Sequence, residues 1–76
     1  MNYQKAILDK DATSKKIKAL ITGSNYTFED LAELLQLKSP RVIYEWVNGN
    51  KLPGLENLYN LALIFNITME DCLVMR

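Results

Sequence analysis

The sequence predicts an all-α protein, a compact bundle of about five short helices. Glycine and proline residues divide its 76 residues into short stretches. Within these stretches, apolar residues recur three and four positions apart, which is the spacing of one helix face. No stretch shows the apolar–polar alternation of a strand. A chain of this length forms one domain, and a small domain buries only about 60% of its surface, so its core must be efficient or completed by a partner.

The first predicted helix begins near Thr13 or Ser14, because either hydroxyl can cap it. It ends at Gly23. Its apolar face consists of Ile17, Leu20 and Ile21. We expect residues 1–12 to form an N-terminal arm or a short extra helix, and residues 13–76 to form the domain.

The second helix is predicted over about residues 28–35. Thr27 precedes it and Asp30 follows three residues later, a spacing that predicts reciprocal capping bonds. Ala32 is small enough to let another helix approach closely. The expected buried stripe consists of Leu31, Leu34 and Leu35.

The third helix is predicted over about residues 40–48, with Ser39 as its cap and Pro40 in its first position. Gly49 ends it, because glycine readily adopts the left-handed conformation. The apolar side consists of Val42, Ile43, Trp46 and Val47. A turn of about three or four residues joins the second and third helices. This is the helix-turn-helix arrangement, whose second helix enters the DNA major groove.

The fourth helix is predicted from about Leu55 to Phe65, ending at Asn66. Its expected apolar face consists of Leu55, Leu58, Leu61, Ala62 and Phe65. Thr68 is expected to cap a last short helix that buries Leu73, with Glu70 and Asp71 in its first turn.

The C-terminal part carries more apolar residues than one core face needs. They are Tyr59, Leu63, Ile64, Met69, Val74 and Met75. Clustered apolar surface often marks an interface, so we expect a homodimer formed through the C-terminal helices. The alternative is that Tyr3, Ile7 and Leu8 fold back and cover this surface.

A longer pattern resembles a known family. From Ile17 to Leu73 the chain resembles the Cro/repressor-type helix-turn-helix proteins, the XRE family, which has the lambda-repressor-like fold. The resemblance rests on Ile17, Thr27–Asp30, Leu31-Ala32, Leu35, Leu37, Ile43, Trp46, Asn48-Gly49, Pro53, Leu58, Leu61-Ala62, Phe65-Asn66-Ile67, Thr68, Asp71 and Leu73. It implies sequence-specific binding of double-stranded DNA by a small transcriptional regulator, repressor or Cro-like.

The resemblance also implies a set of DNA-binding residues. They are Lys38, Ser39, Pro40, Arg41, Tyr44, Glu45, Asn48, Asn50 and Lys51. Arg41 can bind guanine O6 and N7, and Glu45 can accept from cytosine N4. The alternative for these two is an exposed ion pair at i and i+4. The Tyr44 hydroxyl reaches a phosphate or its ring covers the second helix, and Lys51 is either a phosphate contact or a solubilising charge.

The sequence departs from the family pattern in three ways. The segment 37–43 is about one residue longer than usual, so the third helix is expected to start later or to tilt. Phe28 stands at the position after the helix cap, where family members often have a polar residue that contacts phosphate. The third helix also lacks a surface rich in glutamine or arginine. The net charge of zero, Phe28 and the surplus apolar surface keep open a protein-interaction module of the same fold, such as an antirepressor or a toxin–antitoxin partner.

Composition excludes several other classes. There is no histidine and only one cysteine, Cys72, so we expect no disulfide, metal, cofactor or enzymatic activity. No apolar run approaches the ~20 residues of a membrane helix, and the N-terminus has no signal-peptide core. We therefore expect a cytoplasmic protein without a small-molecule ligand, with Trp46 and Cys72 as core residues.

Overall fold

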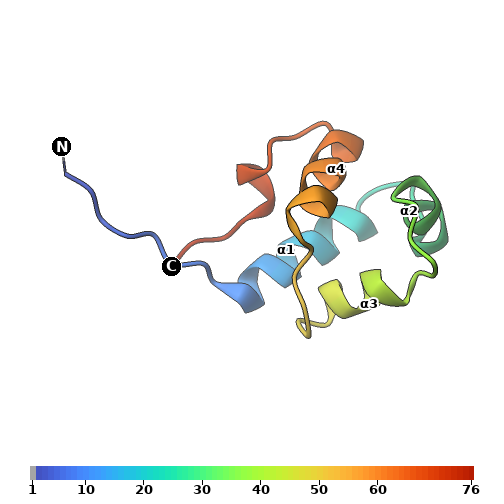
Figure 1. The fold of residues 1–76 in the computed structure, drawn as a ribbon, viewed down its shortest axis with the longest axis horizontal. Coiled ribbons are helices and arrows are strands. Elements are labelled where there is room, and N and C mark those ends of the chain that lie inside the picture. The colour runs from blue at the N-terminus through green and yellow to red at the C-terminus, as the bar shows by residue number, and fades with distance from the viewer. Residues whose placement is uncertain (1) are drawn as a thin grey trace.

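The computed structural model describes residues 2–76, which form four α-helices and one 3₁₀ turn (Figure 1). The elements are α1 (Lys10–Thr22), α2 (Phe28–Leu34), α3 (Arg41–Val47), α4 (Leu55–Phe65) and η1 (Glu70–Cys72). The described part of the chain contains no strand beyond one isolated antiparallel bridge. The all-α prediction is confirmed, with the expected fifth helix reduced to the single turn η1.

Helix α1 begins earlier than the sequence predicted. It starts at Lys10, and the Asp9 side chain caps it by accepting a hydrogen bond from the Ala12 amide at 3.0 Å. Thr13 and Ser14 therefore lie within the helix, and both are almost completely buried. The expected start at these two residues was wrong because their hydroxyls face the protein interior instead of capping.

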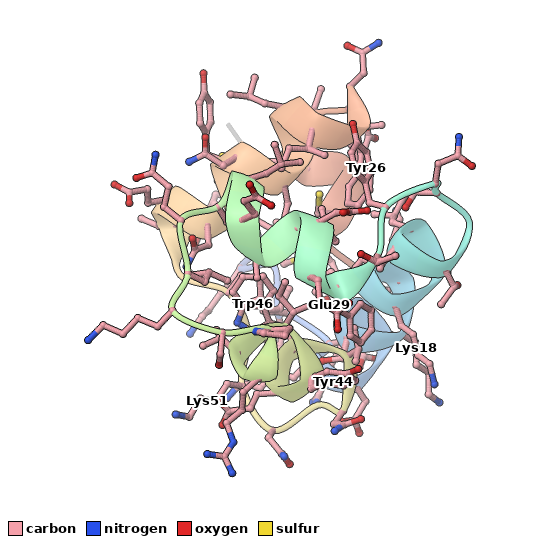
Figure 2. The ribbon with its side chains drawn as sticks, turned by 90° about the vertical axis from the view of Figure 1, so that its right-hand side faces the viewer. Lys18, Tyr26, Glu29, Tyr44, Trp46 and Lys51 are labelled. Atoms are coloured by element: carbon pink, nitrogen blue, oxygen red, sulfur yellow. The ribbon has the colours of Figure 1, made fainter. Side chains whose placement is uncertain are left out.

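The main core lies where all four α-helices meet. Leu31 and Ile43 are fully buried, and Trp46 is 2% exposed between α2 and α3 (Figure 2). The buried members are Ile17, Ile21, Leu31, Ala32, Ile43, Trp46 and Leu61. The predicted core role of Trp46 is confirmed, and α3 is fixed to the bundle by one side only.

Two leucines that the sequence placed in the core are exposed. Leu34 is 54% exposed because α2 packs through Leu31 and Ala32, and Leu34 lies one turn beyond Leu31 on the outer side of the helix. Leu55 is 80% exposed because it is the first residue of α4, ahead of the turn where Leu58 reaches the core.

A second, smaller cluster lies between α4 and η1. Its buried residues are Leu58, Ala62 and Cys72. Thr68 and Asp71 cap η1 reciprocally, each side chain accepting from the other residue's amide at 3.1 Å. Leu73, expected to be buried, is only half-buried at the edge of this cluster.

The segment at the start of α1 meets the C-terminal end of the chain. The Asp9 amide donates to the Val74 carbonyl at 2.8 Å, and the Arg76 amide donates to the Ile7 carbonyl at 2.7 Å. The Thr13 hydroxyl accepts from the Val74 amide at 3.0 Å and lies 3.3 Å from the Val74 carbonyl, to which it donates. We call these contacts, between residues 7–13 and residues 74–76, the terminal seam.

Residues 2–6 extend away from the bundle (Figure 1). Tyr3 is 79% exposed and Ile7 is 51% exposed, so neither covers the C-terminal apolar surface. The Ile7 carbonyl and Leu8 contact the C-terminal segment, through the hydrogen bond from the Arg76 amide and the bridge to Met75. The described residues before α1 form an extended arm rather than an extra helix, whereas residues 10–12, also expected in the arm, belong to α1.

Candidate nucleic-acid interface

The turn between α2 and α3 is longer than the three or four residues expected. Six residues separate Leu34 from Arg41. Gln36 has a φ of 56°, the Gln36 amide donates to the Glu33 carbonyl and the Leu37 amide donates to the Ala32 carbonyl. This pair of bonds is the Schellman motif that closes a helix, here with glutamine in the position that favours glycine.

Helix α3 begins at Arg41, one residue later than predicted. Pro40 directly precedes it with helical angles, φ −69° and ψ −6°. The Ser39 hydroxyl accepts from the Arg41 amide at 3.3 Å. Gly49 follows the helix with a φ of 81°, the left-handed conformation predicted for it.

All nine predicted DNA-binding residues are accessible on α3 and its flanks. Pro40 and Glu45 are half-buried, and the other seven are exposed. The seven are Lys38, Ser39, Arg41, Tyr44, Asn48, Asn50 and Lys51. Because Ile43 and Trp46 hold the opposite side of the helix in the core, α3 presents this polar side to solvent.

An aromatic pair connects the first residue of α2 to the exposed side of α3. The rings of Phe28 and Tyr44 meet edge to face, with centroids 4.4 Å apart and planes at 75°. Phe28 also packs against the main core, while Tyr44 stays 48% exposed. The Tyr44 ring thus covers part of α2, which was one of its two predicted roles, and its partner Phe28 carries no local sequence signal for this contact.

The only ion pair in the described residues joins α3 to the loop that follows it. Lys51 Nζ lies 3.7 Å from Glu45 Oε2. The amides of Asn50 and Lys51 also donate to the Glu45 carbonyl, at 3.1 and 3.3 Å. The alternative pair of Glu45 with Arg41 is therefore not formed. Figure 2 shows Lys51 and Tyr44 on the α3 side of the molecule.

Charge is unevenly distributed around the two helices. Three cationic side chains flank the exposed side of α3, against one acid, Glu45. The acids of α2 are Glu29, Asp30 and Glu33, and Asp30 is engaged in the predicted capping box with Thr27. The neutral chain therefore has a locally basic surface at α3.

Metal-binding groups, membrane-spanning helices and reactive thiols are three further features to consider in residues 2–76. No group of three potential metal ligands occurs there, and none of these helices is long and apolar enough to cross a membrane. Burial raises the pKa of the Cys72 thiol, which keeps it protonated and weakly nucleophilic.

Comparison with known proteins agrees with this geometry. A sequence model of the helix-turn-helix family HTH_3 matches residues 17–72. A curated relative from Enterococcus faecalis, named HTH-type transcriptional activator BcrR, is 35% identical over 60 residues, which are 79% of this chain and 29% of the relative. The chain thus spans less than a third of that protein's length, and no solved structure matches significantly. With α2, the turn and α3 all inside the matched segment, the chain belongs to the XRE-type helix-turn-helix family.

Proposed function

We propose that this protein binds double-stranded DNA in a sequence-specific manner, with α3 in the major groove, and regulates transcription. The observation that carries the proposal is the division of α3 into two sides. Ile43 and Trp46 anchor one side in the core, while Arg41, Tyr44 and Asn48 are exposed on the other. A rigidly held helix with an exposed polar side is what readout of base edges requires.

Arg41 is the proposed principal base reader. It lies in the first turn of α3, is exposed, and forms no ion pair. Its guanidinium is therefore free to donate two hydrogen bonds to guanine O6 and N7. Lys38, Asn48 and Asn50 are exposed beside Arg41 and are the proposed phosphate contacts.

The test is a mobility shift with duplexes selected by the wild-type chain from a randomised pool. We expect salt-dependent binding, and a loss of ~1–3 kcal/mol of specific binding free energy in Arg41→Ala without unfolding. Lys5→Ala, on the extended arm, is the charge-matched control. If no duplex is enriched, the protein-interaction module of the same fold becomes the better assignment.

The proposal includes a homodimer, because two recognition helices one DNA turn apart can read a palindrome. Tyr59 and Leu63 are 54% and 59% exposed on α4. They border a groove of about 540 Å³ that runs between α4 and η1. Sedimentation with and without duplex tests this, with Leu63→Glu expected to abolish pairing without unfolding the monomer. A wild-type chain that stays monomeric at high concentration and binds one to one would overturn the dimer.

A reporter gene placed behind a selected duplex would determine the sign of regulation. The sequence resemblance pointed to a repressor or Cro-like protein, whereas the curated relative is named an activator. A change of reporter expression in either direction supports regulation of transcription, and unchanged expression despite binding would overturn it.

A further inference from the structure

We propose that Lys51 is a positioning residue for Glu45 rather than a phosphate contact. In this role, the Lys51 ammonium holds the Glu45 carboxylate at the surface of α3, where Glu45 discriminates between base pairs. The inference rests on the proposed function, since it names a specificity determinant of the same DNA-binding surface.

The backbone of the loop brings Lys51 back to the last turn of α3, where Glu45 lies. Gly49, in its left-handed conformation, reverses the chain. The Asn50 and Lys51 amides then both donate to the Glu45 carbonyl. The Lys51 backbone is therefore bonded to the same residue that its side chain faces, and Lys51 Nζ lies 3.7 Å from Glu45 Oε2.

The charges explain why this contact matters for binding DNA. Glu45 is the only acid on α3, and an unpaired carboxylate at this surface would repel phosphates. Pairing with Lys51 reduces that repulsion locally. It also leaves Arg41, which has the spacing to pair with Glu45, without an ion partner.

The partial exposure of Glu45 fits a base-reading role. The Glu45 side chain is 32% exposed, whereas the Lys51 side chain is 70% exposed. A carboxylate that is held but still accessible can accept a hydrogen bond from cytosine N4 and disfavour bases that present acceptors at the same place.

A double-mutant cycle on the full chain tests the proposal, using a fluorescent duplex selected by the wild-type chain. We expect Lys51→Met to weaken binding roughly three- to fivefold in the wild-type background. In the Glu45→Gln background, the same change should cost less than about twofold and leave the salt dependence unaltered. Lys5→Met is the control, with no coupling to Glu45→Gln.

Equal losses in both backgrounds, with a salt slope reduced by ~1 in each, would show that Lys51 binds phosphate and would overturn the proposal. A second measurement needs no DNA. Side-chain scalar couplings of Glu45 should show one dominant rotamer in the wild-type chain and averaging in Lys51→Met. Unchanged rotamer populations would overturn the positioning role even if the chain binds no duplex at all.

Discussion

The α2–α3 region and the terminal seam are stabilised by different kinds of contact. In the α2–α3 region, capping and turn bonds join residues close in sequence, such as Thr27 with Asp30 and Ala32 with Leu37. In the seam, hydrogen bonds join Thr13 to Val74 across 61 positions. The first kind forms wherever the local sequence allows it, whereas the second exists only once the bundle has brought the two ends together.

The difference also concerns what each region does. The α2–α3 region combines a rigid apolar side with an exposed polar side, so its packing serves the proposed DNA contact. The seam lies beside the first turns of α1 and contributes none of the nine predicted DNA-binding residues. Changes in the α2–α3 core should therefore affect global stability, while changes in the seam should act first on the ends of the chain.

The largest effect is expected from a matched pair in α2. Leu31 is fully buried and Leu34 is 54% exposed, although both were predicted to be core. Leu31→Ala should lower the free energy of unfolding by ~2–5 kcal/mol because it leaves a cavity. Leu34→Ala should change it by less than ~0.5 kcal/mol. Urea unfolding followed by circular dichroism measures both, and equal losses would contradict the observed packing of α2.

The next effect concerns the seam. Thr13→Val removes the hydroxyl that accepts from the Val74 amide, so an amide in a partly buried contact loses its partner. We expect a loss of ~1–3 kcal/mol. Amide hydrogen exchange should accelerate at Val74 and Asp9 before it does so in α3. Thr13→Ser, which keeps the hydroxyl, is the control, and uniform acceleration in both variants would show that the seam is not a separate unit.

A gain of stability is expected at the turn of the helix-turn-helix. Gln36 pays a steric cost at φ 56° that glycine avoids. Gln36→Gly should raise the free energy of unfolding by ~0.5–1 kcal/mol. This net gain allows for the greater conformational entropy that glycine gives the unfolded chain. Asn66, at φ 58° after α4, offers the comparison. Because asparagine tolerates this conformation better than glutamine, Asn66→Gly should raise the free energy of unfolding by less than Gln36→Gly does. A larger gain from Asn66→Gly would contradict the steric explanation.

The smallest effect is a dependence on pH next to the seam. Hydrogen bonds from the Thr68 amide and hydroxyl lower the pKa of Asp71 from its usual 3.8. The ionised Asp71 carboxylate therefore contributes its full stabilisation at pH values above the ordinary pKa of an aspartate. This stabilisation is lost as the pH falls through the lowered pKa of Asp71 in the folded protein. Urea midpoints at neutral and acid pH should converge between the wild-type chain and Asp71→Asn. A constant difference would show that the cap does not depend on ionisation.

Most of the α2–α3 region could be predicted because its signals are local. The Thr27–Asp30 box, the Trp46 anchor and the Gly49 stop each depend on residues within a few positions, and each is present in the structure. The long segment 37–43 predicted a later start of the third helix, and α3 begins at Arg41. The full six-residue turn and the Lys51–Glu45 pair could not be predicted, because both depend on how the backbone curves after a helix ends.

The sequence by itself determined the all-α class, the approximate extent of α2 and α3, and which polar residues lie in and beside α3. It could do so because capping, helical periodicity and turn chemistry act over one or two turns. Only the tertiary structure decided that Thr13 binds Val74 instead of capping α1, that Leu34 and Leu55 face solvent, and that Glu45 pairs with Lys51. The physical reason is that burial and long-range hydrogen bonds depend on which elements become neighbours, and a single stretch of sequence does not carry that information.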